Sequence, residues 1–325
     1  MNRAVAPNHN CARIQPVSPG ARRPLWSVLI PTYQDGAYLD EALNSVLSQD
    51  RGQDQMEILV MDDASDPSAE PRVRALAGER VVYLRQEANV GKVRNYELGL
   101  RTSRGQLIHQ LHGDDRILPG FYMAMEKAFA DHPQAGAFFG RVFYVDKAGL
   151  RIRESSSAFN DTGIWPDALN QLLIKQHIQT PSMVCRRTVY ESLGGFDRRF
   201  DCMEDWEMWI RVANRFPVGF LDRVVAEYRV HSNNTTSSRL RSGERFKTLR
   251  LLHSVTSEYV APEMVEAVRR ARSQAAAGMW INFIPQSIAE RRWGLLWKLV
   301  SEALSYDPSP RTLRRCAGMV RLAQH

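Results

Sequence analysis

The chain has 325 residues, 44% of them hydrophobic and 24% charged, and no apolar run approaches the length that crosses a bilayer. These proportions are ordinary for a globular protein and exclude a chain built of membrane spans. Residues 1–239 contain 29 Lys/Arg and 29 Asp/Glu, so the net charge of +7 comes from residues 240–325. This split argues against a nucleic-acid-binding protein, which needs a basic stripe with base-reading or stacking residues.

The N-terminal segment, residues 1–24, is polar, rich in Pro and carries four Arg and no acid. It lacks the apolar core of a secretory signal, so we expect a flexible tail and a cytoplasmic protein. The cysteines match neither a zinc pattern nor a disulfide framework, which fits a reducing compartment. They are Cys11, Cys185, Cys202 and Cys316.

Over the first 130 residues, short apolar segments alternate with amphipathic ones. The predicted strands are 26–30, 56–61, 81–84 and 106–111, and the predicted helices are 38–47, 73–77, 91–100 and 121–130. This alternation predicts an α/β fold, a mostly parallel sheet with helices on both faces. Ligands bind beyond the carboxyl ends of such strands, so the polar clusters that follow these strands are expected to meet at one rim.

The middle of the chain is less regular. The pattern predicts strands at 137–145 and 182–185, helices at 189–193 and 204–213, and paired strands within 218–230. Beyond about residue 240 the pattern becomes helical and basic. We therefore expect three parts: the tail 1–24, an α/β domain over 25–238, and a basic helical C-terminal region over 239–325.

The pair Asp114 and Asp115 directly follows the fourth predicted strand. Adjacent carboxylates repel each other, and a hard cation such as Mg²⁺ or Mn²⁺ accepts ligands of this kind together with phosphate oxygens. The alternative is a solvated turn, since Asp is common in turns.

Two other strand ends carry candidate nucleotide contacts. A carboxylate at Asp63 suits the ring N–H of a uracil-type base, and the alternative is an Asx-type turn into Pro67. Gly91 allows a ligand to approach the backbone, and the Arg94 guanidinium suits phosphate or a base edge. The alternative for Arg94 is a surface position on an amphipathic helix.

Taken together, these motifs resemble family 2 glycosyltransferases of the GT-A fold, which transfer a sugar from a nucleotide donor to an acceptor. The resemblance covers roughly residues 25–238. The matching segments, in the family's order, are SVLIPTYQDGAYLDEALNSVLSQ, EILVMDDASDPS, NVGKVRNYELGL, GQLIHQLHGDDRILPGF, TPSMVCRRTVYESLGGFDRRF, CMEDWEMWIRVA and YRVHSNNTTSS.

The resemblance implies a metal-dependent hexosyltransferase that inverts the anomeric centre. It places Asp115 on Mn²⁺ or Mg²⁺, Asp114 near the donor's ribose or sugar, and Asp63 on the base. Many family members carry another Asp two residues before the Asp pair, where this chain has His112. This departure leaves the identity of the metal open, and it leaves open whether His112 or His231 contacts the metal.

The resemblance also assigns the remaining site residues. The loop of Pro31, Thr32 and Tyr33 forms the other wall of the nucleotide site, with Tyr33 against the base; a core position is the alternative for this aromatic. His231 lies near the metal or diphosphate, although a lone His is more often structural.

Glu204 and Asp205 open the helix predicted at 204–213. The resemblance makes Asp205 the base that takes the acceptor's proton, with Glu204 orienting the acceptor. Inverting transfer needs only one such base. The alternative is a pair of acids that stabilises the helix N-terminus.

The resulting hypothesis is a transferase with a UDP-sugar donor, because Asp63 suits uracil. By analogy its acceptor is a glycan or lipid-linked glycan of a bacterial surface polysaccharide. One alternative is a metal-dependent nucleotidyltransferase, which predicts a basic, Gly-rich loop after the first strand, whereas PTYQDGAY has no basic residue. The other is a non-catalytic protein that binds sugar nucleotides.

The C-terminal region places Trp280, Phe283, Trp293 and Trp297 among several Arg. One hypothesis is an amphipathic element that lies peripherally on the inner face of an anionic membrane. The alternative, which we favour from sequence alone, packs these aromatics on the catalytic domain or on another subunit of a homo-oligomer.

Overall fold

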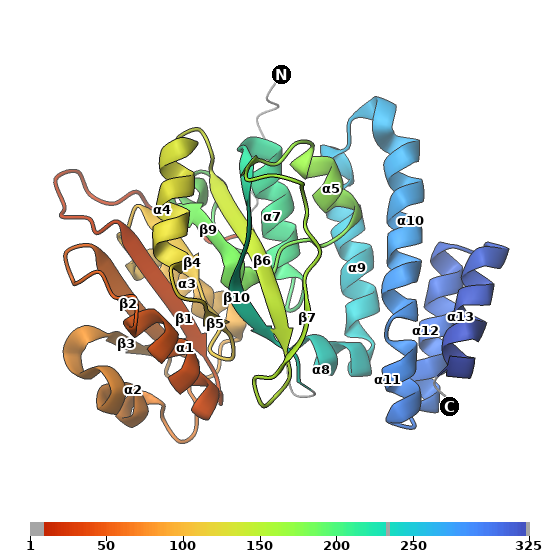
Figure 1. Ribbon diagram of the computed structural model, residues 1–325, viewed down its shortest axis with the longest axis horizontal. Coiled ribbons are helices and arrows are strands. Elements are labelled where there is room, and N and C mark those ends of the chain that lie inside the picture. Colours follow the sequence, from red (N-terminus) through yellow and green to blue (C-terminus); the bar gives the residue numbers. More distant parts are fainter. Residues whose placement is uncertain (1–9, 232–234, 323–325) are drawn as a thin grey trace. The chain divides into compact units, whose positions relative to one another are not determined.

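The computed structural model describes residues 10–231 and 235–322 (Figure 1). The chain divides into two compact units. Unit 1 comprises Met1–Ala168 and His177–Asn234, and unit 2 comprises Leu169–Gln176 and Thr235–His325. The second unit therefore takes a short segment from the middle of the chain, which the sequence pattern did not indicate.

Unit 1 is built on a ten-stranded sheet with the order β3-β2-β1-β4-β9-β6-β10-β5, in which β7 pairs with β6 and β8 with β10. The strands are β1 (Trp26–Thr32), β2 (Met56–Asp62), β3 (Val82–Arg85), β4 (Leu107–Gln110), β5 (Arg116–Ile117), β6 (Ala137–Val145), β7 (Arg151–Glu154), β8 (Gly163–Ile164), β9 (Met183–Arg186) and β10 (Val218–Arg229).

Strands β1 to β4 run parallel, and so do β6 and β10, while β9 lies antiparallel between β4 and β6. This arrangement confirms the predicted α/β class. The prediction of paired strands within 218–230 was wrong, because β10 is one strand with register shifts after Leu221 and Val224. The exposed residues Asp222 and Arg223 lie at this irregularity, and their polarity resembles a turn in the sequence.

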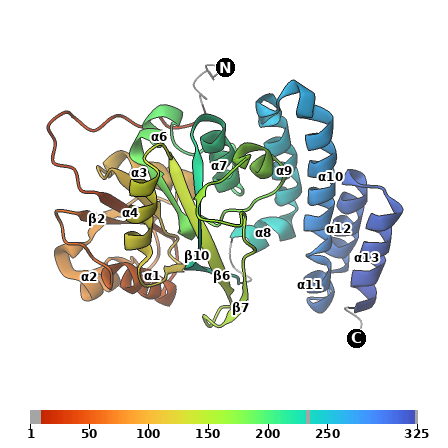
Figure 2. The same cartoon turned by 45° about the horizontal axis from the view of Figure 1, so that its top comes forward.

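Helices cover both faces of the sheet (Figures 1 and 2). On one face α1 (Ala37–Leu47), α2 (Glu70–Ala77) and α4 (Phe121–Asp131) share a core with the alternating β1 residues Val28 and Ile30. The intervening β1 residue, Leu29, faces α3, where the absence of a side chain at Gly99 leaves room for Met61 of β2. The helices of this second face are α3 (Lys92–Thr102), α6 (Arg187–Leu193) and α7 (Glu204–Arg215).

Part of the segment predicted as a flexible tail packs on unit 1. Ala12 and Ile14 are buried, and the Ala12 carbonyl accepts a hydrogen bond from the Gly195 N–H at 2.8 Å. Cys11 also forms a β-bridge with Asp197. Apolar side chains at positions 12 and 14 are the reason that this part is held in place; residues 1–9 lie outside the described residues.

Unit 2 is helical, as the sequence predicts for the C-terminal region. Trp280 is fully buried against Phe246, and buried Arg272 donates to the Leu173 carbonyl at 2.7 Å. Its helices are α5 (Ala168–Ile174), whose first residue belongs to unit 1, α8 (Thr235–Ser242), α9 (Glu244–Val255), α10 (Val265–Ile281), α11 (Ile284–Ala289), α12 (Trp293–Tyr306) and α13 (Pro310–Leu322). Within residues 10–231 and 235–322, no helix has both the length and the hydrophobicity that spanning a membrane requires.

Candidate active site

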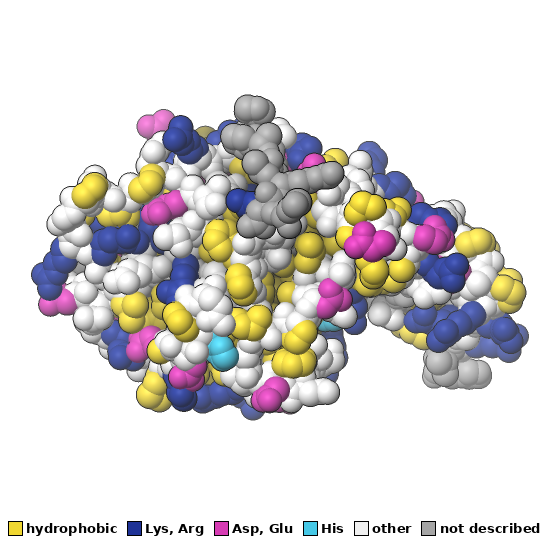
Figure 3. Space-filling view, turned by 90° about the horizontal axis from the view of Figure 1, so that it is seen from above, with side chains coloured by type: hydrophobic (Ala, Val, Ile, Leu, Met, Phe, Trp, Pro, Cys, Tyr) yellow, Lys and Arg dark blue, Asp and Glu magenta, His cyan; other side chains and the backbone are white. Residues whose placement is uncertain are grey.

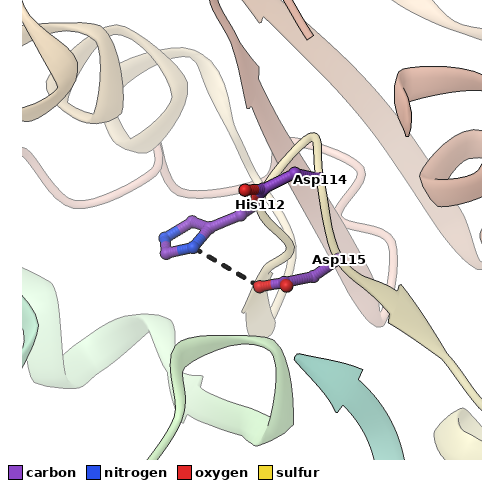
Figure 4. A group of neighbouring side chains, drawn as sticks. All are labelled: His112, Asp114 and Asp115. Carbon is purple, nitrogen blue, oxygen red and sulfur yellow. Dashed lines mark ion pairs between the residues drawn. The ribbon is translucent and has the colours of Figure 1, made fainter. Parts of the chain in front are cut away.

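The loop between β4 and β5 brings three potential metal ligands together. One ligand atom each from His112, Asp114 and Asp115 lies within 4.8 Å of the others (Figure 4). The loop is held close to the end of β1, since a Cβ on Gly113 would overlap the Asp35 carboxylate and come within 3.0 Å of the Pro31 carbonyl. Glycine at this position therefore allows the loop to lie against β1.

The Asp115 carboxylate is buried and only half satisfied. Its Oδ1 accepts the Arg229 backbone N–H at 2.8 Å. Its Oδ2 is 3.5 Å from His112 Nδ1, but it accepts no hydrogen bond from the described residues. Burial and the adjacent charge of Asp114 raise the pKa of Asp115 to about 6. A buried carboxylate oxygen without a donor, beside a second carboxylate and an imidazole, fits a divalent cation.

The Asp114 carboxylate is in a different situation. Burial favours its neutral form, but a hydrogen bond with His231 and the charge of His112 outweigh this effect and lower its pKa. His231 Nε2 lies 3.1 Å from Asp114 Oδ2. The group of three potential ligands includes His112 and does not include His231, so metal binding by His231 stays a prediction.

Buried Arg229, at the end of β10, connects the same loop to α1. Its Nε donates to the Asp114 carbonyl at 2.8 Å, and its Nη2 pairs with Glu41 of α1 at 2.6 Å. The guanidinium also lies 4.4 Å from the Tyr38 ring centroid. These contacts fix the loop to both α1 and β10, so the carboxylates do not depend on a ligand for their position.

Asp63 organises the loop that precedes α3. Its two oxygens accept the backbone N–H groups of Val90 at 2.8 Å and Gly91 at 3.0 Å. Gly91 has a φ of 83°, a left-handed conformation that favours glycine. Asp63 therefore shapes the predicted nucleotide site by fixing this loop, a role that the sequence did not indicate.

The other predicted nucleotide contacts lie at the same end of the sheet. Pro31 and Thr32 are the last residues of β1, and the Thr32 carbonyl accepts the Asp63 N–H at 3.0 Å. Tyr33 is 49% exposed, so its ring is available to a ligand. Arg94 is exposed and makes no hydrogen bond or ion pair with any residue that the structure describes.

The acid pair at the start of α7 forms an ion pair with a lysine of α3. Glu204 is buried, and its Oε1 pairs with Lys92 Nζ of α3 at 2.7 Å. Its Oε2 has no hydrogen-bond partner among the described residues. The Asp205 Oδ2 accepts the Thr180 hydroxyl at 3.1 Å, and its Oδ1 accepts the Trp206 N–H at 2.7 Å. Burial and the Glu204 charge raise the pKa of Asp205, while Lys92 opposes this shift.

Tyr96 of α3 connects the two carboxylate groups. Its hydroxyl lies 2.9 Å from His112 Nε2. Burial and the charges of Glu204, Asp205 and Asp114 raise the pKa of Tyr96 well above its ordinary value. Lys92 of the same helix pairs with Glu204 at 2.7 Å, so α3 contacts both carboxylate groups.

Three site residues were missed from sequence: Asp35, Lys92 and Tyr96. Burial and the charge of Asp114 raise the pKa of Asp35 to about 7, so it belongs to the same charged cluster. Lys92 follows Gly91, a predicted site residue, so the sequence indicated that Lys92 lies near the site. It did not indicate that Lys92 pairs with Glu204. Tyr96 lies on a helix where an aromatic residue ordinarily indicates core packing. The site thus offers a candidate cation position and a separate, half-buried carboxylate, Asp205, that is able to accept a proton.

Comparison with known families gives this geometry a context. Residues 27–194, more than half of the chain, match the model of the family described as Glycosyl transferase family 2. An uncharacterised protein of Mycobacterium tuberculosis is 29% identical over 279 residues, which cover 82% of this chain and 84% of that protein. An uncharacterised glycosyltransferase of Methanocaldococcus jannaschii is 24% identical over 224 residues, 67% of this chain and 75% of that protein.

Two solved structures have a similar fold. Residues 1–349 of S. aureus TarS, in complex with UDP-GlcNAc, give a TM-score of 0.62 at 16% identity over 86% of this chain and 81% of that one. The mannosyltransferase PcManGT of Pyrobaculum calidifontis, in complex with GDP-Man and Mn²⁺, gives a TM-score of 0.58 at 18% identity. The match covers 97% of this chain and 83% of that one. These likenesses concern the fold, and they confirm the predicted GT-A arrangement. The ordered motifs, the fold and the family match lead to one conclusion: the chain belongs to glycosyl transferase family 2.

Proposed function

We propose that this protein is an inverting glycosyltransferase that moves a sugar from a nucleoside-diphosphate donor, a UDP-sugar, to a hydroxyl of a glycan or lipid-linked glycan. The observation that carries the proposal is the unpartnered Asp115 oxygen, buried beside Asp114 and His112 in the site that also holds Asp205. A hydrolase of glycosides needs no diphosphate-binding cation, whereas a nucleotide-sugar transferase of this kind uses one.

The donor's diphosphate would lie at the β4–β5 loop. Asp115, Asp114 and His112 would hold Mn²⁺ or Mg²⁺, which supplies Lewis-acid stabilisation of the charge that develops on the leaving diphosphate. His231 positions Asp114 through their contact at 3.1 Å, and its predicted place on the metal is part of the same proposal. Asp114 would also contact the donor's ribose or sugar.

The nucleoside would lie between the end of β1 and the loop before α3. Pro31, Thr32 and Tyr33 form one wall, and Gly91 and Arg94 form the other. Each Asp63 oxygen already accepts one backbone N–H, but a carboxylate oxygen has a second lone pair with which to accept a uracil N–H. The two similar structures contain UDP-GlcNAc and GDP-Man respectively. An experiment therefore has to identify the nucleotide base of the donor.

Asp205 would act as the base. As the acceptor oxygen attacks the anomeric carbon, its proton passes to an Asp205 oxygen and the bond from the anomeric carbon to the diphosphate oxygen breaks. The configuration inverts because attack and departure take place on opposite sides of the carbon. Burial raises the pKa of Asp205, which brings its basicity closer to that of an efficient base near neutral pH. Glu204 has one oxygen without a partner among the described residues, and this oxygen would accept a hydrogen bond from a hydroxyl of the acceptor.

A direct test measures the melting temperature with UDP, GDP and their sugars, each with Mn²⁺ and with EDTA. We expect UDP-sugars to stabilise the protein only when Mn²⁺ is present, because a ligand that binds the folded state raises its stability with concentration. NMR of the product should then show an inverted anomeric centre. Release of pyrophosphate would favour a nucleotidyltransferase, and binding without turnover on any acceptor would favour a non-catalytic protein. Stabilisation by GDP-sugars alone would overturn the UDP assignment.

A cytoplasmic role in the synthesis of a bacterial surface polysaccharide completes the proposal. It rests on analogy with the family, and the test is the loss of a surface glycan when the gene is deleted and its return with the wild-type chain.

A further inference from the structure

Two of the seven tryptophans differ from the rest. Trp293 is 55% exposed and Trp297 is 72% exposed, whereas the other five are at most 4% exposed. Both lie on α12 at a spacing of four residues, so they share one side of the helix. The buried residues of α12, Leu296, Leu299 and Ala303, lie on a different side. The internal packing of unit 2 therefore uses α12 without using its two tryptophans.

The same part of the chain is strongly basic. Residues 291–322 contain seven Lys/Arg and two acids. Both acids are engaged within unit 2, since Glu302 pairs with Arg250 at 2.6 Å and Asp307 accepts the Thr312 hydroxyl at 2.6 Å. Helix α13 has four Arg, all exposed, and no acid among its residues. Lys and Arg side chains gather over these C-terminal helices in Figure 3, with hydrophobic side chains among them.

We propose that α12 and α13, which contact each other, form a surface that binds an anionic lipid bilayer. Tryptophan is favoured at the boundary between headgroups and acyl chains, and Arg and Lys near it attract anionic headgroups. The surface combines these two chemistries, and an excess of five positive charges complements an anionic leaflet. The binding is peripheral, because no described helix has the length and hydrophobicity to span a membrane.

The structure supports only in part the alternative that the aromatic residues of the C-terminal region pack inside the protein. Trp280, one of the aromatics in this region, is indeed in the core of unit 2. Trp293 and Trp297 are not, so internal packing explains only part of the aromatic content. The inference does not depend on the proposed transfer, since vesicle binding is measured without donor or acceptor.

The positions of the tryptophans provide a specific spectroscopic test. The probe is a vesicle of phosphatidylcholine, with or without phosphatidylglycerol, added to the full-length protein. We expect a blue shift of tryptophan emission and loss of iodide quenching with the anionic vesicles only, and reversal of both on addition of salt. Brominated acyl chains in the vesicles should quench the same emission. Because the other five tryptophans are buried, these changes report on Trp293 and Trp297.

Two variants and two matched controls complete the design. The double variant Trp293→Ala, Trp297→Ala should weaken sedimentation with anionic vesicles by about tenfold or more. Arg291→Glu reverses an exposed charge next to the tryptophans and should weaken it by about tenfold. The matched controls are Leu150→Ser with Ile152→Ser, which are 69% and 59% exposed on or beside β7, and Arg13→Glu, an exposed Arg of unit 1; neither should change binding.

Several outcomes would overturn the proposal. One is equal binding of the wild-type protein and the double tryptophan variant, with circular dichroism showing both folded. Another is equal binding to neutral and anionic vesicles. A third is a dimer in light scattering that dissociates on the tryptophan substitutions, which would make this surface an interface between copies of the chain. Poor iodide quenching of the free protein would mean that the tryptophans are already covered.

Discussion

The two carboxylate pairs of the site are similar in sequence and different in environment. Asp114–Asp115 lies in a loop after a strand, and its neighbours leave the buried Asp115 Oδ2 without a donor. Glu204–Asp205 opens a helix, and Lys92 of another helix already pairs with Glu204 at 2.7 Å. The first pair has two imidazoles beside it, His112 Nδ1 at 3.5 Å from Asp115 Oδ2 and His231 Nε2 at 3.1 Å from Asp114 Oδ2, and no ammonium or guanidinium ion pair among the described residues. The second pair has the Lys92 ammonium.

This difference shows how the surroundings of two adjacent acids decide whether they suit proton transfer or cation binding. An ammonium group beside a carboxylate pair offsets their mutual repulsion without any added ligand. A carboxylate pair without such a partner is stabilised by an added divalent cation. The following predictions test whether the two pairs are divided between proton transfer and cation binding.

The largest effect is expected at Asp205. Replacing Asp205 by Asn keeps the hydrogen bond from the Thr180 hydroxyl through the amide oxygen but removes the proton acceptor. We expect kcat to fall by about 10³-fold, within the range for loss of a general base, with the Kd of the donor unchanged. Calorimetry with UDP and Mn²⁺ measures the Kd, and Asp131→Asn, an exposed acid of α4, is the matched control. Retained turnover would remove Asp205 from the mechanism.

The next effect concerns the cation. In Asp115→Asn the amide oxygen still accepts the Arg229 N–H, while the nitrogen replaces the oxygen that has no donor. We expect affinity for UDP in Mn²⁺ to fall by about 100-fold, as for loss of a metal ligand or its support, and affinity in EDTA to stay the same. The metal-free variant should melt no lower than the metal-free wild type, because one of two like charges is gone. Equal Mn²⁺-dependent binding by both proteins would contradict the division.

Lys92 gives the sharper comparison between the pairs. The Lys92 ammonium lowers the pKa of Asp205 against burial and the Glu204 charge, which raise it. Lys92→Met removes the lowering contribution, so the pKa of Asp205 rises. A base must be deprotonated to act, so the acidic limb of the pH profile of kcat/KM should move to higher pH, by about one pH unit. Lys92→Arg keeps the charge and should restore the wild-type limb. A parallel drop at all pH values in Lys92→Met would indicate a structural effect instead.

The sequence was sufficient to predict which end of the sheet carries these acids, for a topological reason. Asp63 and Asp115 follow strands that run parallel in one sheet, so their positions beyond the strand ends were set once the strand–helix alternation was recognised. The α/β class followed from the same alternation. The segment 169–176 was assigned incorrectly to the α/β domain because a short helix carries no signal for the unit it joins.

The contacts between side chains were beyond the reach of the sequence. Nothing in the spacing of Lys92 and Glu204, more than a hundred residues apart, indicates that they pair, and nothing marks the Tyr96 hydroxyl as a neighbour of His112. The Asp63 carboxylate was predicted to contact a base, yet its backbone contacts to Val90 and Gly91 depend on the conformation of a loop. Residue type and strand position predict the chemistry available at a site, and packing decides which groups share it.

The smallest effect is expected at Arg94, two residues after Lys92 on α3. Lys92 is engaged by Glu204, whereas Arg94 makes no ion pair with the described residues and is therefore free for an anionic ligand. Arg94→Ala should raise the Kd of UDP by about tenfold, the range of one charge-assisted hydrogen bond, and leave kcat within about twofold at saturating donor. Arg101→Ala, on the same helix and 56% exposed, should change neither. If both substitutions have the same effect, α3 contributes general positive charge and Arg94 has no specific contact with the donor.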